Sequence, residues 1–154
     1  MKKISYLLSA VILAGVLAMA GCGDDDSSGP TVEEQQRQFL EGTWSVNSSD
    51  DVLLDGNTGT TGDWSNFSIQ FQSNGNVQVN GESTDVDVFD VSTYTISGTA
   101  ANSFTVTFDG TDAVTVTRGD TDNDMILSFT RSDEEPLGGK KASISGAWVF
   151  NLSK

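Results

Sequence analysis

The chain has 154 residues, of which 22 are acidic, 8 are basic and none is histidine, so its net charge is −14 at neutral pH. This charge excludes a nucleic-acid partner, because phosphates are bound by clustered cations, and it excludes docking on anionic lipid through a basic face. Without histidine the chain cannot build a Ser-His-Asp or Cys-His catalytic group or a histidine metal ligand. Its length suits a single domain.

Residues 1–21 have the pattern of a targeting segment. A positive start at Lys2 and Lys3 precedes an apolar run that ends in two small residues, the second of which is Gly21, in front of the single cysteine, Cys22. The run is shorter than the roughly 20 apolar residues of a spanning helix, and no positive charges follow it at once. We therefore expect a leader that is cleaved between Gly21 and Cys22.

The residues around this cysteine, LAMAGC at 17–22, resemble the lipobox of bacterial lipoproteins. In that class a leader peptidase cuts before the cysteine, whose sulfur receives a diacylglyceryl group and whose new amino terminus is usually acylated. The resemblance implies that Cys22 carries the lipid and leaves no free thiol. Because each buried methylene contributes about 0.8 kcal/mol, such acyl chains would anchor the protein stably in a bilayer. The alternative is an ordinary secretory leader followed by an unmodified cysteine.

Residues 22–31 are expected to form a flexible acidic tether. They are small, polar and charged, with three consecutive aspartates, and cannot bury enough apolar area to fold. In double-membrane bacteria an aspartate directly after the lipidated cysteine commonly marks the inner membrane. Here that position is Gly23, which favours the outer membrane. An acidic run at this place also resembles the surface-export signals of some Bacteroidetes lipoproteins, although an acidic triplet is most often only a solvated linker.

A short helix is predicted over residues 32–41. Thr31 and Glu34 fit a capping box, in which each side chain accepts a hydrogen bond from the other residue's backbone. Gly42 is placed to end the helix. Its expected apolar stripe consists of Val32, Phe39 and Leu40.

The rest of the chain alternates apolar and polar residues with a period of two, which is typical of antiparallel strands with one face on a core. We expect an all-β domain over residues 32–154, either an antiparallel up-and-down barrel or a flattened sandwich of about 8–9 strands. The alternating apolar residues are Trp44 and Val46; Phe67, Ile69 and Phe71; Val77 and Val79; Val86 and Val88; Tyr94 and Ile96; Phe104, Val106 and Phe108; Val114 and Val116; Leu127 and Phe129; and Trp148, Phe150 and Leu152.

One hairpin register can be predicted from parity. A two-residue turn after Phe71 would place that ring opposite Gln78, a polar residue. A three-residue loop over 73–75, with Gly75 in a left-handed bulge, places Phe71 opposite Val77 and keeps both strands apolar inward. We therefore expect the bulged loop. Further hairpin loops are expected at residues 81–84, 109–112 and 118–120.

A second resemblance lies at the start and end of this domain. Gly42-Thr43-Trp44 follows the helix and resembles the G-x-W opening of lipocalins and of small lipocalin-like domains in bacterial lipoproteins. Residues 71–77 and the closing segment 146–152, which contains Trp148, are similar to that group as well. The resemblance implies a barrel whose first and last strands carry Trp44 and Trp148. Those two strands are expected to pair or to pack on facing sheets, with both rings in the core.

The expected interior admits two functions. A barrel of about eight strands can be filled by its own side chains or hold one small ligand. The inward positions are mostly large, which favours a packed interior or a shallow site at the mouth, while a pocket for a small hydrophobic ligand stays open. A carrier predicts an internal apolar cavity. A structural or protein-interaction lipoprotein predicts a full barrel with an exposed apolar or aromatic patch.

Catalytic and metal sites are not expected. Close carboxylate pairs could perform glycosidic chemistry, but in a chain this acidic some pairs must be close by chance. Residues 120–124 open like a calcium loop, yet Met125 stands where glycine belongs and Arg131 where the bidentate glutamate belongs. A solvated hairpin tip is the better interpretation. The sequence thus predicts a lipid-anchored envelope protein without cofactor, whose barrel binds a small hydrophobic ligand or an envelope partner.

Overall fold

The computed structural model describes residues 29–58, 62–83, 88–131 and 145–154. The predicted leader over 1–21, the cleavage pair Gly21 and Cys22, and most of the tether over 22–31 therefore lie outside the described residues. Within the described ranges, no helix combines the length and the hydropathy needed to cross a membrane.

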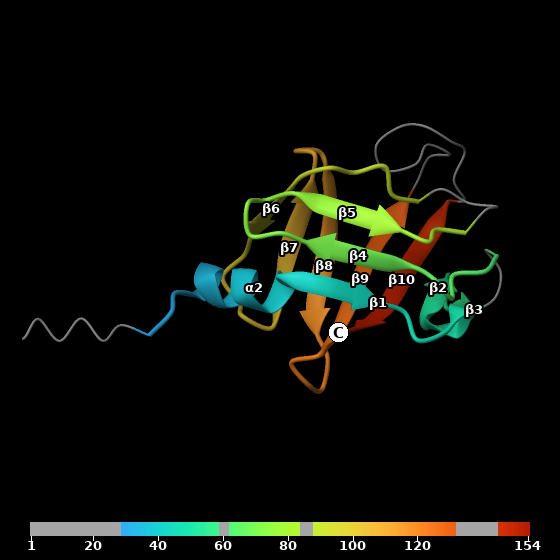
Figure 1. Ribbon diagram of the computed structural model, residues 1–154, viewed down its shortest axis with the longest axis horizontal. Helices are drawn as coiled ribbons and strands as arrows, with labels where there is room; N and C mark the ends of the chain where they lie inside the picture. Colours follow the sequence, from blue (N-terminus) through green and yellow to red (C-terminus); the bar gives the residue numbers. More distant parts are fainter. Residues whose placement is uncertain (1–28, 59–61, 84–87, 132–144) are drawn as a thin grey trace, which may run out of the picture.

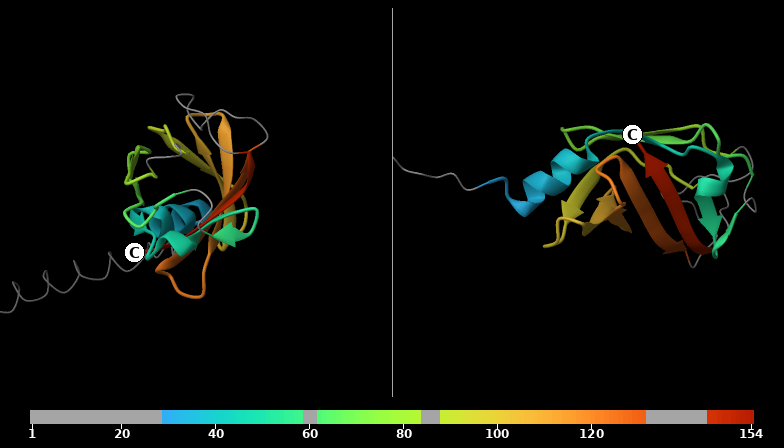
Figure 2. Two further views of the ribbon diagram at one scale, coloured as in Figure 1. Left: turned by 90° about the vertical axis from the view of Figure 1, so that its right-hand side faces the viewer. Right: turned by 90° about the horizontal axis from the view of Figure 1, so that it is seen from below.

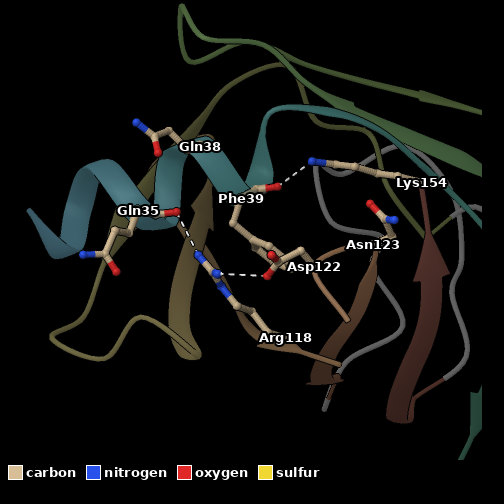
Figure 3. A pocket seen from close by; sticks show the side chains of 7 residues that line it. All are labelled: Gln35, Gln38, Phe39, Arg118, Asp122, Asn123 and Lys154. Atoms are coloured by element: carbon tan, nitrogen blue, oxygen red, sulfur yellow. Dashed lines mark hydrogen bonds and ion pairs between the residues drawn. The ribbon is translucent and has the colours of Figure 1, made fainter. Parts of the chain in front are cut away.

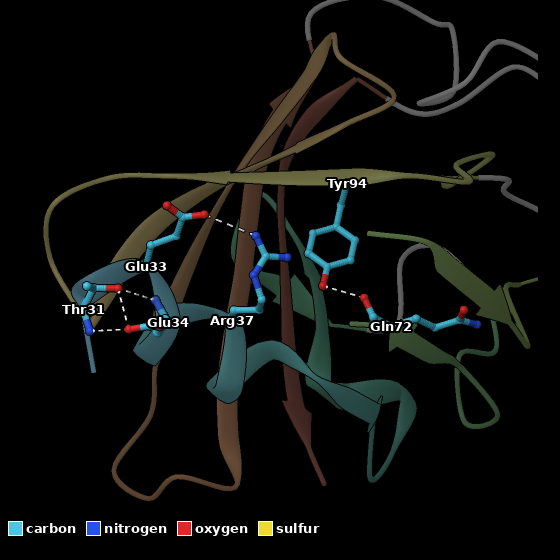
Figure 4. A network of polar contacts seen from close by, with 6 residues as sticks. All are labelled: Thr31, Glu33, Glu34, Arg37, Gln72 and Tyr94. Atoms are coloured by element: carbon cyan, nitrogen blue, oxygen red, sulfur yellow. Dashed lines mark hydrogen bonds and ion pairs between the residues drawn. The ribbon is translucent and has the colours of Figure 1, made fainter. Parts of the chain in front are cut away.

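The predicted N-terminal helix is present as α2, Val32–Leu40. The Thr31 amide donates to a Glu34 carboxylate oxygen at 2.7 Å and the Glu34 amide donates to the Thr31 hydroxyl, so the capping box is confirmed (Figure 4). The predicted stripe was wrong at one end, because Val32 is 37 % exposed. Gln36 is buried in its place, and its amide donates to backbone carbonyls in the turn after β6 (Tyr94–Ser97).

Ten strands form one antiparallel sheet, and eight of them follow the order β5-β4-β1-β10-β9-β8-β7-β6, which nearly closes into a barrel (Figures 1 and 2). The predicted all-β barrel is thereby confirmed. The remaining strands, β2 and β3, form a hairpin beside β10, after the short 3-10 helix η1. The bounds are η1 Ser49–Asp51, β1 Gly42–Ser45, β2 Val52–Leu54, β3 Asn57–Thr58, β4 Ser68–Phe71, β5 Val77–Asn80, β7 Ser103–Phe108, β8 Asp112–Arg118, β9 Asp124–Arg131 and β10 Gly146–Ser153.

The first and last strands meet as predicted, but only at one end. β1 and β10 are joined by the pair Ser45 and Ser153. Further along β10 the partner is β2, with Trp148 opposite Leu54. Because β1 diverges from β10, the β2–β3 hairpin supplies the hydrogen bonds that would otherwise be missing from this edge.

The other seam of the barrel lies between β5 and β6. A single bridge joins Asn76 to Thr93. The Tyr94 amide donates to the Gly75 carbonyl at 2.8 Å, and the Tyr94 hydroxyl donates to the Gln72 carbonyl at 2.8 Å (Figure 4). Burial raises the pKa of this hydroxyl, which keeps it a neutral donor. The Tyr94 side chain thus adds a hydrogen bond across a seam that the backbones of β5 and β6 close only in part.

The loop between β4 and β5 has the predicted bulged register. Phe71 lies opposite Val77, and the pairing continues to Ser68 and Asn80. Gly75 has a positive φ of 85°, the left-handed conformation that the bulge requires of this position. The hairpin turns β7–β8 and β8–β9 also lie where they were expected. The expected segment ending at Val88 lies partly outside the described residues, and Val88 itself is buried outside any strand.

Candidate functional site

The barrel interior was the first candidate for a ligand site, and aromatic rings occupy it. Phe150 on β10 lies among several of them, with ring centroids 5.0 Å from Phe67, 5.3 Å from Trp64 and 5.4 Å from Phe89. Trp148 extends the same cluster, 6.0 Å from Trp64. All of these rings are buried. A hydrophobic ligand in this part of the interior would have to displace rings that already pack on one another.

Several of the residues that fill the interior were missed by the sequence pattern. Trp64 lies in the loop between β3 and β4, and Phe89 lies in the segment before β6, so neither belongs to an alternating strand. Met125 begins the inward series of β9, whereas the alternating series predicted for this strand starts only at Leu127. The size of Trp64 could have predicted its burial, because a large aromatic side chain is usually buried even where the loop that carries it is exposed.

The two predicted fold-signature tryptophans lie in the core but at separate places. Trp44 and Trp148 are both 0 % exposed, as expected. The Trp44 ring lies tilted against Phe39 of α2, with centroids 5.0 Å apart, whereas Trp148 belongs to the cluster around Phe150. Gly42 has φ 120°, and the Lys154 side chain crosses it. The tryptophan of the first G-x-W motif therefore packs at the helix end of the barrel. The tryptophan of the second motif packs in the ring cluster around Phe150.

The outer wall of the barrel is almost free of charge. Among the ten strands, charged residues occur only at the first or last position, at Asp112 and Arg118 in β8 and at Asp124 and Arg131 in β9. The outward positions between them carry mainly hydroxyl and amide side chains. Threonine suits this surface because β-branched residues favour strands. The acidic residues of the described ranges instead lie in α2, in turns and at strand ends.

The described residues do not provide the apolar patch expected of a protein-interaction barrel. Their exposed large hydrophobic side chains are Val32 on α2 and Ile126 on β9. Surface hydrophobic residues at this frequency are ordinary in soluble domains. A protein-interaction barrel would therefore have to use another surface in these parts of the chain, and the hydroxyl-rich wall is available for it.

An open pocket of about 380 Å³ lies where the last turn of α2 meets the β8–β9 turn and the end of β10 (Figure 3). Two of the four basic side chains of the described ranges, Arg118 and Lys154, line it. The remaining lining residues are Gln35, Gln38, Phe39, Asp122 and Asn123.

Both cations bind the carboxyl end of α2. The Lys154 ammonium donates to the Phe39 carbonyl at 2.7 Å, and one terminal nitrogen of Arg118 donates to the Gln35 carbonyl at 2.9 Å. The Trp44 indole donates to the next carbonyl of the helix, at 2.8 Å. The last carbonyls of a helix lack intrahelical partners and carry a partial negative charge, so these donors stabilise the helix end.

The same two cations also lie over aromatic rings. The Arg118 guanidinium lies 4.3 Å from the centre of the Phe39 ring, and the Lys154 ammonium lies 4.4 Å from the Trp44 ring. Burial lowers the pKa of Lys154, the nearby charge of Arg118 lowers it further, and the carboxylate of Glu41 opposes them. The two positive charges thus lie at the same end of α2, near enough for the charge of Arg118 to affect Lys154, in a partly desolvated place.

The acidic hairpin tip shows no metal geometry. Thr121 donates to the Asp124 carboxylate at 2.6 Å and accepts from the Asn123 amide, so the turn bonds to itself. In the part of the chain that the structure describes, no three Asp, Glu, Cys or His side chains gather as a metal would need. Residues 119–123 form the turn between β8 and β9, as predicted for a hairpin tip.

A single carboxylate, Asp109, binds the segment that leads into β6 beside the β5–β6 seam. The Asp109 carboxylate, in the β7–β8 turn, accepts from the amide and hydroxyl of Thr93 at 2.8 Å each and from the Ser92 amide at 3.1 Å. Partial burial would raise the pKa of Asp109, but the hydrogen bonds from Thr93 and Ser92 outweigh it and hold the pKa below 3.8. These contacts hold the β7–β8 turn against the segment that leads into β6.

The pocket beside α2 and the neutral wall are two exposed surfaces of the described residues that differ in their chemistry. No family model, no curated protein and no solved structure matches the chain.

Proposed function

We propose that this protein is a lipid-anchored component of the cell envelope, held at the outer membrane through a lipid on Cys22. In this proposal the barrel is not catalytic, and it binds an envelope partner through its outer surface. The LAMAGC sequence at 17–22, the positive start and the acidic segment after the cysteine support the anchor. The described N-terminal residues lead away from the barrel beyond α2, as an anchored barrel requires (Figure 1).

The observation that carries the choice of partner is the ring cluster of the interior. Phe150 is surrounded at ring distances of 5.0 to 6.0 Å by Trp64, Phe67, Phe89 and Trp148. These rings already bury one another's apolar surface, which in a carrier would line the ligand cavity. A small hydrophobic ligand, the other function expected from the sequence, finds less support here. We therefore expect the partner to bind to the outer surface of the barrel.

The neutral wall is the part of that outside which suits a partner. Burying a charge without a counterion costs several kcal/mol, whereas hydroxyl and amide groups can exchange water for a partner's hydrogen bonds at little net cost. Charges at the strand ends, such as Asp112 and Asp124, would lie at the rim of such a contact. We therefore place the partner on β7, β8 and β9, and we expect its contact surface to be neutral and rich in hydrogen-bonding groups.

The anchor is tested by mass spectrometry of the protein purified from membranes. We expect the mass of residues 22–154 plus a diacylglyceryl group and one further acyl chain. In the Cys22→Ser variant, we expect neither the lipid nor cleavage, because the thiol is the acceptor of the lipid. An unmodified Cys22 with residues 1–21 removed would refute lipidation and indicate an ordinary secretory leader.

The partner is tested by photo-crosslinking in intact cells. A crosslinking residue at Thr115, exposed in the middle of β8, should yield one dominant adduct with an envelope protein. The matched control places the same group at Asp120, which is exposed in the acidic β8–β9 turn and should yield none. Equal adducts at the two positions, or none at Thr115, would contradict the proposed surface. A stoichiometric hydrophobic molecule in native mass spectra would instead restore the carrier function.

A further inference from the structure

The pocket beside α2 has donor capacity that the helix does not use. The second terminal nitrogen of Arg118 lies 3.6 Å from the Asp122 carboxylate, too far for a good hydrogen bond. Lys154 has three N–H donors, and the Phe39 carbonyl takes one of them. Asn123 lines the same pocket on the side of Arg118 and Lys154, whereas the Gln38 amide is turned to the other side of α2 (Figure 3). Two cations and one side-chain amide therefore border the same open space.

The charges around this space favour an anion of low charge. Arg118 and Lys154 lie close enough for each positive charge to disfavour the other, and a negative group between them would relieve that repulsion. Asp122 is the present counterion of Arg118, but its side chain is 92 % exposed while that of Arg118 is 20 % exposed. An exposed ion pair contributes little, about 0–1 kcal/mol. A ligand can therefore replace Asp122 at small cost.

We propose that this pocket binds a carboxylate that carries a neighbouring amide, with Arg118 and Lys154 holding the carboxylate and Asn123 bonding the amide. A guanidinium matches the plane of a carboxylate. Because Asp122 and Glu41 lie nearby, a dianion such as phosphate meets more repulsion than a monoanion. Small acylated amino acids and the free carboxyl end of a peptide share this chemistry. The inference does not depend on the partner proposed for the barrel wall.

The test is an NMR titration of the full-length protein in detergent with N-acetylglycine, whose neutral analogue is N-acetylglycinamide. We expect saturable shifts at the backbone amides of Asn123 and Lys154 with the acid and none with the neutral analogue. An acetylated tetraglycine with a free carboxyl end serves as the peptide arm. Tighter binding of the tetraglycine would identify a peptide end as the ligand, and equal binding would identify a small acid. Inorganic phosphate should bind more weakly than either acid.

Three variants test the site, and two of them leave both helix-capping cations in place. Asp122→Asn removes the competing carboxylate from an exposed position, so we expect N-acetylglycine to bind about threefold more tightly. Asn123→Ala should weaken binding by about threefold while leaving the unfolding midpoint unchanged, because the side chain is in the exposed turn. Arg118→Gln should abolish binding, with the shifts of α2 reporting whether the helix remains capped. Equal responses to the acid and the neutral analogue, or no effect of Asp122→Asn, would overturn the proposal.

Discussion

The barrel interior and the pocket beside α2 both contain buried aromatic rings, but only the rings beside α2 have cations over their faces among the contacts of the described residues. Around Phe150 the neighbours are other rings, and the packing is complete in itself. Beside α2 the rings of Phe39 and Trp44 are covered by Arg118 and Lys154, whose charged ends stay near solvent. The difference teaches that aromatic content does not locate a binding site. Hydrogen-bond donors that the folded chain does not use are the better guide to such a site.

The largest effect expected is in the interior. Phe150→Ala should lower the free energy of unfolding by about 3–5 kcal/mol, because it removes the ring that several others contact and leaves a cavity. Urea denaturation followed by tryptophan fluorescence measures this loss. Phe39→Ala, at the helix end, is the matched control and should cost less, since its cavity can be filled by Arg118. A smaller loss for Phe150 than for Phe39 would reverse the comparison.

The two G-x-W glycines give a second contrast. A Cβ added at Gly146 would lie 2.6 Å from Leu54 and 2.9 Å from the Asp55 carboxylate, and one added at Gly42 would lie 3.3 Å from the flexible end of Lys154. Both positions have positive φ, which costs a side chain about 1–2 kcal/mol.

We therefore expect Gly146→Ala to cost about 2–4 kcal/mol and Gly42→Ala about 1–2 kcal/mol, measured by thermal unfolding. The excess for Gly146 comes from Leu54, which is fixed in the core, whereas Lys154 can move aside. Equal losses would indicate that backbone strain alone decides both positions.

The smallest effect concerns the seam. Asp109→Asn keeps a residue type that tolerates the positive φ of 44° but removes the charge that accepts from Ser92 and Thr93. We expect a loss of about 1 kcal/mol at neutral pH, reduced from the value for buried charged bonds because the site is mostly exposed.

The pH dependence of this loss follows from the lowered pKa of Asp109. A carboxylate with a lowered folded pKa stabilises the protein above its unfolded value of 3.8, and this stability disappears as the pH falls through the folded value. The difference between the parent protein and Asp109→Asn should therefore shrink below pH 3.8. A difference that stays constant with pH would mean that the charge of Asp109 plays no part.

Local patterns predicted most of the framework. The capping box placed the start of α2, the parity of Phe71 and Val77 placed the β4–β5 register, and period-two alternation identified eight of the ten strands. Each of these features is decided within a few residues of chain. β2 and β3 were missed because they are short and carry no alternating run, and their pairing with β10 depends on where β1 ends.

The sequence by itself determined the charge, the leader pattern with its cysteine, the helix start and the alternation of the strands, because short-range sterics and hydrogen bonding set these properties. Only the tertiary structure decided that Trp64 and Phe89 fill the interior and that Gln36 is buried. It alone brought Arg118 and Lys154 to one pocket. Those residues come from distant parts of the chain, and the closure of the barrel, which no local pattern encodes, sets the distance between them.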